Sequence, residues 1–485
     1  MIIIGIDVGT TGTKALAVDD TGKILGYGYC EYSLETPRDG WVIQNAEDWW
    51  KASVCAVREA LSSVQDKNSV AAIGLSTQGA TMLAADENGN PLSHAITWMD
   101  TRADKETAEL IEKFGEELIY RKSGWNPAPT LDASKIMWIR KNNPDLFKSA
   151  SYFISTLEFM NIKLTGRNII DPSNAAIRQI MDIQVGEWDS EILDFLGIDE
   201  SRLPEIMPSG EFIGMLTQKA SDDLGLPQNI KVYNGAHDQY CSAIGSGTLN
   251  PGEILIATGT TWVALGVTEK LLYSKSRLAP GIFPLTGYFG AMASMVSAGS
   301  ALKWWRSVIG GSYADIDSGA SERMETAADL LVYPYVAGAG ILHDPNEKAA
   351  VIGMTLRHDK YDIARALMEG VAFEARLLLE EFARCGMKTK TLTMSGGAAK
   401  SSVWREITGY VTGYGINLTE ESESACIGAA MTAAVGLGIY ADLQFCAKIF
   451  VKQKKAELSD IRQYEFYEDK FKRYCDRFKQ VTAMC

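Results

Sequence analysis

The residues best suited to chemistry, by type and by spacing, lie in the first predicted turn of the chain. An apolar run ends at Ile6, Asp7 follows, and residues 9–14 read Gly-Thr-Thr-Gly-Thr-Lys before apolar residues resume. This order predicts a strand, a tight glycine turn and a second strand. Glycine lets the backbone come close to an anion, and further donors lie beside it in Thr10, Thr11, Thr13 and Lys14.

The position of Asp7 sharpens this interpretation. A carboxylate at the end of a strand, beside a phosphate-binding turn, is placed to attract a divalent cation directly or through water. The segment therefore predicts a site for a nucleotide polyphosphate with Mg²⁺. The alternative is an ordinary glycine-rich hairpin with an incidental acid.

The pattern returns in the middle of the chain. Residues 253–267 again run from an apolar stretch through Thr258-Gly-Thr-Thr261 to a second apolar stretch. A supersecondary unit repeated after ~250 residues indicates two related domains, each offering a phosphate-contacting hairpin. Chance similarity of two Thr/Gly turns is the alternative. Residues 391–399 add a further strand that ends in a glycine-rich turn.

Asp238 supplies a candidate catalytic group. It follows an apolar stretch and opens a segment of small residues, which predicts the N-terminus of a helix. A carboxylate there could accept the proton of a substrate hydroxyl during phosphoryl transfer, or it could simply cap the helix. The neighbouring His237 is one of four histidines, none in zinc-like spacing, so a structural or indirect role is expected.

Several function classes are excluded or disfavoured. No P-loop and no Rossmann glycine pattern is found, and the Gly-x-Ser-x-Gly elbow occurs only in degenerate form at Gly245. A net charge of −14 without a basic run argues against a nucleic-acid partner. Eight scattered cysteines without a C-x-x-C pair, no leader-like start and no apolar run of ~20 residues predict a cytoplasmic protein that does not span a membrane.

A chain of 485 residues exceeds what one hydrophobic core usually covers, so we expect two α/β domains. Periodicity predicts helices over 46–62 and 362–384 and a buried strand over 70–77. Small residues predict a tightly packed helix over 425–439, and the charged last ~30 residues predict a surface helix. Turn chemistry near 246–252 places the boundary between domains 1–247 and 248–485.

These segments occur in the order seen in the FGGY carbohydrate kinases, which the chain resembles over roughly residues 2–440. The resemblance rests on the turn at 7–14 together with Trp98-Met-Asp-Thr-Arg102, His237-Asp-Gln239, Thr258-Gly-Thr260, Gly353-Met-Thr-Leu-Arg357, Glu369-Gly370 and Ser395-Gly-Gly-Ala398. It implies two ribonuclease-H-like (actin-like ATPase) domains, with ATP and a sugar bound in the cleft between them. Closure of that cleft would exclude water and limit wasteful ATP hydrolysis.

The resemblance also implies roles for individual residues. Asp238 would be the catalytic base, and Asp7 with Asp238 would serve the metal. The phosphate-binding residues would be Thr10, Thr11, Thr13, Lys14, Thr258, Gly259 and Thr260, and the adenosine-contacting loop would be Gly396, Gly397 and Ala398. The sugar pocket would be lined by Gln78, Trp98, Asp100, Arg102 and Gln239. Trp98 could instead be plain core, and Asp100 with Arg102 a local salt bridge.

Three departures from the family pattern bear on the substrate. Glycerol kinases carry an Arg-Glu pair after the glutamine that aligns with Gln78; here Gly79-Ala80 follows, which argues against glycerol. The Met-His pair usual in xylulose kinases is also missing, which weakens D-xylulose without excluding it. A Gly-Glu-Arg-x-Pro stretch common in the second domain is replaced by residues 338–343, so any contact made by that loop is in doubt.

The sequence thus predicts an ATP- and Mg²⁺-dependent kinase that transfers the γ-phosphate to a terminal hydroxyl of a small ketose or polyol. A pentulose such as D-xylulose is the first candidate, and ribulose, fuculose, erythritol and gluconate are the alternatives within the family. An actin- or Hsp70-like ATPase without a sugar substrate is the alternative from another class. A homodimer is expected from the resemblance alone.

Overall fold

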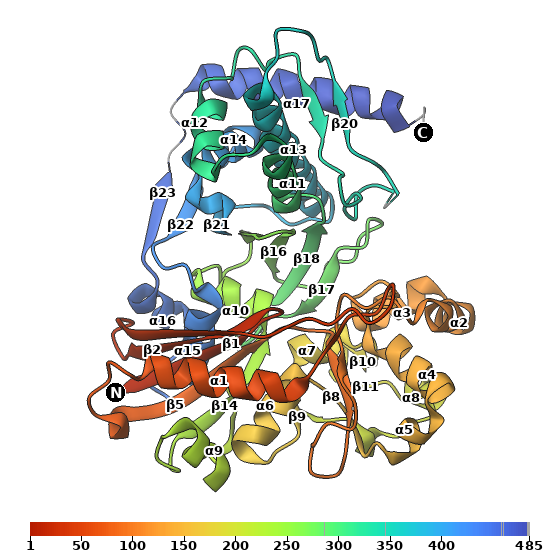
Figure 1. Cartoon of the computed structure of the whole chain (residues 1–485), viewed down its shortest axis with the longest axis vertical. Helices are drawn as coiled ribbons and strands as arrows, with labels where there is room; N and C mark the ends of the chain where they lie inside the picture. The colour runs from red at the N-terminus through yellow and green to blue at the C-terminus, as the bar shows by residue number, and fades with distance from the viewer. Residues whose placement is uncertain (286, 345, 457, 459, 483–485) are drawn as a thin grey trace.

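Two large mixed sheets organise the chain, one in each half (Figure 1). The computed structural model describes residues 1–285, 287–344, 346–456, 458 and 460–482. The first sheet has the order β13 (Phe212–Met215), β14 (Lys231–His237), β5 (Val70–Thr77), β1 (Ile2–Val8), β2 (Gly12–Asp19) and β3 (Ile24–Glu31). The second has the order β17 (Ala279–Ile282), β18 (Phe289–Met295), β16 (Trp262–Thr268), β15 (Glu253–Thr258), β21 (Thr391–Gly396), β22 (Ile416–Thr419) and β23 (Gln453–Ala456).

The predicted repeat is confirmed and extends beyond the two turns. β1 pairs antiparallel with β2 and parallel with β5, and β15 pairs in the same two ways with β16 and β21. The residue after the parallel strand even makes the same bond in both halves. The N–H of Gln78 donates to the Val8 carbonyl at 2.9 Å, and the N–H of Gly397 donates to the Thr258 carbonyl at 2.8 Å. The two hairpins therefore occupy equivalent positions in two related sheets.

The helices of the first half cover its sheet and carry a peripheral layer. They are α1 (Ala46–Ala60), α2 (Asp104–Phe114), α3 (Glu116–Ser123), α4 (Asp132–Asn142), α5 (Pro144–Ser149), α6 (Thr156–Thr165), α7 (Pro172–Ile177), α8 (Ser190–Leu196), α9 (Gln218–Leu224) and α10 (Asp238–Gly245). α1 begins where predicted, because the side chain of Asn45 accepts from the N–H of Glu47. β5 matches the expected strand in both bounds.

Further short strands pair outside the two large sheets, in both halves of the chain. A four-stranded sheet joins β4 (Ile43–Gln44), β7 (Ala95–Ile96), β6 (Met82–Ala85) and β8 (Tyr152–Ser155). Two-stranded pairs join β9 (Ile169–Ile170) with β12 (Glu205–Ile206), β10 (Met181–Asp182) with β11 (Glu187–Trp188), and β19 (Leu331–Tyr333) with β20 (Ala350–Ile352). The small sheet containing β4 and β7 places two segments beside the first turn, which matters for the site below.

The helices of the second half are α11 (Gly299–Ile309), α12 (Tyr313–Ser321), α13 (Lys360–Arg384), α14 (Ser402–Thr412), α15 (Ser424–Gly436), α16 (Leu443–Phe450) and α17 (Ile461–Thr482). The long α13 confirms the helix predicted over 362–384, and its inward face packs into the second core. Among the described residues, no helix is long and apolar enough to cross a bilayer.

α15 is part of the second half of the sequence but packs against elements of the first half. It lies against β1, β5 and α10 of the first half, at the junction of the two bodies (Figure 1). The packing is so close that a Cβ atom at Gly5 would meet the Cys426 carbonyl oxygen at 2.0 Å, and one at Gly428 would meet the Cys241 carbonyl oxygen at 1.9 Å. The tightly packed helix predicted over 425–439 is confirmed. The predicted domain boundary between residues 247 and 248 stays a prediction, since α15 follows that boundary in the sequence but packs against the first sheet.

The prediction of a simple surface helix at the end of the chain is wrong for one face of α17. That face buries Tyr467, Phe471 and Tyr474 in the second core. Lys470 is also fully buried, where its ammonium lies 2.5 Å from a carboxylate oxygen of Glu369 on α13. Because Lys470 is buried as part of an ion pair with good geometry, its charge in the sequence wrongly indicated a solvated face.

Candidate active site

Asp7 stands at the end of β1, at the entrance to the first turn. The Ser76 hydroxyl donates to its Oδ1 at 2.7 Å. Burial and, secondarily, the nearby charge of Asp238 raise the pKa of Asp7 to about 6. The structure therefore brings together the two carboxylates that the sequence analysis proposed for the metal and for proton transfer.

Asp238 is the first residue of α10, but it does not cap the helix. The cap is His237, whose Nδ1 accepts from the N–H of Gln239 at 3.3 Å. The Asp238 side chain keeps 29% of its surface exposed, so its carboxylate can be reached from solvent. Burial of the remainder raises the pKa of Asp238 to about 6, against hydrogen bonds from Gln239 that favour the charged form.

This pair of carboxylates fits a magnesium ion. Both are hard oxygen donors, and the cost of burying them and their mutual repulsion would be relieved by a cation. In the part of the chain that the structure describes, no cluster of three or more His, Cys, Asp or Glu residues could hold a metal. Mg²⁺ usually completes its coordination with water and substrate phosphates, so two protein carboxylates suit it.

His237 has a more specific place than the sequence suggested. Burial lowers its pKa to about 4, so the ring is neutral at pH 7, and its Nδ1 lies 3.3 Å from both the backbone nitrogen of Gln239 and Oδ1 of Asp238. A Cβ atom at Gly79 would lie 2.4 Å from His237 Cδ2 and 2.7 Å from Nε2. The imidazole thus lies against the segment where glycerol kinases carry their Arg-Glu pair.

Two predicted sugar residues lie directly beside the first turn. Trp98 is not core, since 43% of its surface is exposed, and its indole N–H donates to the Thr10 hydroxyl at 3.0 Å. Gln78 is buried, and its Oε1 has no hydrogen-bond partner among the described residues. An exposed indole is a suitable surface for stacking on a sugar, and an unpaired buried amide oxygen lacks the donor that would satisfy it.

Asp100 and Arg102 form the local salt bridge that was the alternative to a sugar role. Arg102 donates to the buried Asp100 carboxylate through Nε at 2.8 Å and through Nη2 at 2.6 Å, and the backbone N–H of Val42 adds a bond at 2.6 Å. The guanidinium lies 3.7 Å from the centroid of the Trp41 ring. A sugar contact by either residue stays a prediction.

Lys14 points toward a carboxylate of the second half. Its ammonium lies 2.6 Å from Glu423, the residue before α15. Burial alone would lower the pKa of Lys14, but the hydrogen bond and charge of Glu423 outweigh it and raise the pKa. Lys14 is therefore held charged beside the turn formed by Thr10, Thr11 and Thr13.

The second turn and the glycine-rich loop after β21 are joined through Thr258. Its hydroxyl donates to the Ser395 carbonyl at 2.5 Å and accepts from the N–H of Ala398 at 3.0 Å. The structure thus brings together the segments predicted for phosphate and adenosine, which comprise Thr258, Gly259, Thr260, Gly396, Gly397 and Ala398. None of these carries charge, so any attraction for phosphate must come from N–H and hydroxyl dipoles.

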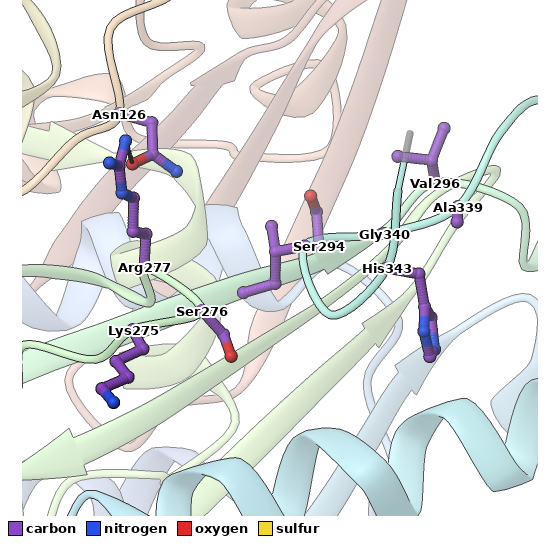
Figure 2. Close-up of a pocket in the computed structure, with 10 residues that line it drawn as sticks. Asn126, Lys275, Ser276, Arg277, Ser294, Val296, Ala339, Gly340 and His343 are labelled. Atoms are coloured by element: carbon purple, nitrogen blue, oxygen red, sulfur yellow. Dashed lines mark hydrogen bonds between the residues drawn. The ribbon is translucent and has the colours of Figure 1, made fainter. Parts of the chain in front are cut away.

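The loop at residues 338–343 borders a cavity of about 330 Å³ (Figure 2). In the figure Arg277 reaches toward Asn126 of the first half, while His343 points away toward the helix below. The His343 ring nitrogen lies 3.0 Å from a carboxylate oxygen of Glu374 on α13, which fixes the loop to the second core. None of the predicted site residues lines this cavity.

The sequence also matches known protein families. The N-terminal domain of the FGGY family of carbohydrate kinases matches residues 2–245, and its C-terminal domain matches residues 254–437. The chain belongs to this family. It is therefore an ATP-dependent sugar phosphotransferase.

Relatives described as carbohydrate kinases match over the whole chain. A xylulose kinase of Bacillus subtilis is 29% identical, with 99% of this chain and 98% of the relative covered. A glycerol kinase of Thermococcus kodakarensis is also 29% identical, over 99% and 98%. The crystal structure of a Rhodospirillum rubrum xylulose kinase, 23% identical, superposes with a TM-score of 0.93 over 100% and 99%, which establishes the fold.

Sequence reasoning missed two side chains that hold the first turn. Tyr32 donates its hydroxyl to the Gly9 carbonyl at 2.5 Å, and Gln44 donates its amide to the Thr10 carbonyl at 2.6 Å. Neither belongs to a recognisable motif in a single sequence. Only Gln44 offers a weak signal, a polar residue in the short apolar stretch before α1.

Proposed function

We propose that this kinase transfers the γ-phosphate of Mg²⁺-bound ATP to a terminal hydroxyl of a small open-chain ketose, with a pentulose such as D-xylulose as the first candidate. The observation that carries the proposal is the Asp238 carboxylate, which is uncommitted to capping, has a raised pKa and lies near Asp7. The acceptor class is supported by relatives described as xylulose kinases.

In this proposal the side chains and turns described above have the following roles. Asp238 accepts the proton of the sugar hydroxyl as its oxygen bonds to the γ-phosphorus and the bond from that phosphorus to the bridging oxygen of ADP breaks. The two turns and Lys14 donate to the phosphate oxygens and keep the reacting groups in line. Asp7 and Asp238 would hold Mg²⁺, which neutralises phosphate charge when bound.

The sugar pocket favours a ketose over glycerol. The relative from Thermococcus is described as a glycerol kinase, but this chain has Gly79-Ala80 where such enzymes carry Arg-Glu. The neutral His237 beside Gly79 offers an N–H donor instead of a charged grip. An uncharged donor suits a carbonyl or hydroxyl oxygen of a sugar better than the carboxylate of a sugar acid.

A coupled ADP-release assay tests the proposal. The purified protein would be incubated with ATP and Mg²⁺ and a panel of ketoses, aldoses, polyols and sugar acids. We expect the highest kcat/KM with a pentulose, and product analysis should place the phosphate on a terminal hydroxyl. A higher kcat/KM with a polyol or with gluconate would overturn the acceptor class. ATP turnover indifferent to every sugar would overturn the kinase reaction itself.

A further inference from the structure

Gln44 carries a polar amide that is buried in the N-terminal half of the structure, with 1% of the residue's surface exposed. It lies on β4 and makes three side-chain hydrogen bonds. Its Nε2 donates to the Thr10 carbonyl at 2.6 Å, and its Oε1 accepts from Trp49 Nε1 at 3.2 Å and from Gln78 Nε2 at 3.1 Å. One buried amide thus touches both the phosphate turn and a predicted sugar residue.

The orientation of this amide is determined by its neighbours. An indole N–H can only donate and a carbonyl oxygen can only accept, so Gln44 must turn Oε1 toward Trp49 and Nε2 toward Thr10. Because Oε1 is an acceptor, Gln78 is obliged to face it with its NH₂ group. The flip state of Gln78 follows from that of Gln44.

The remaining atom of Gln78 is the informative one. Its Oε1 is buried and has no hydrogen-bond partner among the described residues. An unsatisfied buried acceptor is costly, and it selects a ligand that brings a donor. A sugar hydroxyl supplies such an O–H, and the partly exposed Trp98 bonds to Thr10, the same residue of the turn that Gln44 contacts.

We propose that Gln44 is a positioning residue that presents the Gln78 Oε1 as an acceptor for a sugar hydroxyl and ties this contact to the Thr10 backbone of the phosphate turn. The inference rests on the proposed sugar kinase function. Sugar bound at Gln78 and phosphate bound at Thr10 are then connected through one amide. Loss of that amide should weaken sugar binding and the stimulation of ATP turnover by sugar together.

The first variant is Gln44→Leu, which keeps the size of the side chain and removes its polar atoms. We expect the sugar KM to rise about tenfold or more, because Gln78 is free to rotate and its NH₂ loses its acceptor. The ratio of ATP turnover with and without sugar should fall as well. The control is Asn161→Leu, since Asn161 is an equally buried amide that donates to the Ile169 carbonyl, away from the turn.

The second variant, Gln44→Glu, separates the two connections. One carboxylate oxygen can still accept from Trp49 and Gln78, so the sugar KM should stay within about threefold of wild type. The other oxygen now faces the Thr10 carbonyl, which should lower kcat. Relative to wild type at each pH, kcat should recover toward pH 5.5, because a protonated carboxyl can again donate to that carbonyl.

Three results decide the matter. Wild-type sugar KM and kcat in Gln44→Leu would overturn the inference, and so would changes no larger than those in Asn161→Leu at equal loss of Tm. Absence of the relative pH recovery in Gln44→Glu would overturn the connection to Thr10. Failure of the proposed function is distinct, because the wild-type protein would then phosphorylate no sugar in the panel.

Discussion

The two Thr/Gly turns join equivalent pairs of strands but have very different chemistry. In equivalent positions of the repeat, Asp7 and its partner Lys14 in the first hairpin correspond to Ala257 and its partner Val263 in the second. The first turn therefore carries both charges, while the second carries none. The first is also bonded to the side chains of Gln44 and Trp98, whereas the second is bonded to the glycine-rich loop after β21 and, through the N–H of Ser300, to the start of α11.

This difference shows how two copies of one fold can take on different chemical roles. Charge is concentrated on the side where a proton and a phosphoryl group would move, and where a metal would be held. The neutral turn offers fixed dipoles, which can hold an ADP moiety without changing its chemistry. The following predictions test this division.

Replacing Asp238 with Asn should have the largest effect. The amide cannot accept the hydroxyl proton, so kcat should fall about 10³-fold while the sugar KM changes little. Steady-state ADP release measures both constants. Asp48→Asn, at an exposed position on α1, is the control and should match wild type. Wild-type turnover in Asp238→Asn would refute its role as base.

Making the second turn acidic should break the asymmetry. Ala257→Asp places a carboxylate where the first turn has Asp7, but without the Lys14 counterpart. Repulsion of the phosphates should raise the ATP KM more than about tenfold. The isosteric Ala257→Asn separates charge from size and should raise it much less. Equal effects of the two variants would show that the absence of charge in this turn is unimportant.

Loosening the neutral turn should affect nucleotide and not sugar. Thr258→Val removes the hydroxyl that accepts from the N–H groups of Ala398 and Ala399. The ATP KM should rise about fivefold, since the loop loses its attachment, and the sugar KM should stay unchanged. Trp98→Phe, which removes the indole N–H that bonds to Thr10 and part of the exposed ring surface available for stacking on a sugar, should show the opposite pattern. Equal shifts of both KM values in either variant would contradict the separation of the two turns.

The smallest expected effect concerns stability in the absence of metal and nucleotide. The pKa of Asp7 is about 6 in the folded chain and 3.8 as its ordinary value, so the folded state binds the proton more tightly. The contribution of Asp7 to the free energy of unfolding therefore falls as pH rises from about 4 to about 6. Asp7→Asn should raise Tm at pH 7 and leave it unchanged at pH 3.5. An equal change of Tm at both pH values would contradict this.

Local patterns allowed the turns, α1, β5 and α13 to be predicted, because each depends on residues close in sequence. The position of Asp238 followed for the same reason. Gln44 and the burial of Lys470 could not be predicted, since their partners Gln78 and Glu369 lie 34 and 101 residues away. The homodimer, the cytoplasmic location and the identity of the sugar stay predictions.

The crossing of α15 over the first sheet has a consequence for the order of synthesis. Until residues 424–436 leave the ribosome, β1 and β5 have one face without the helix that covers it, although they are made first. The N-terminal half alone would expose that face, with Gly5 and Gly74 at its surface. The packing of this face of the first sheet is therefore completed only after α15 has been synthesised.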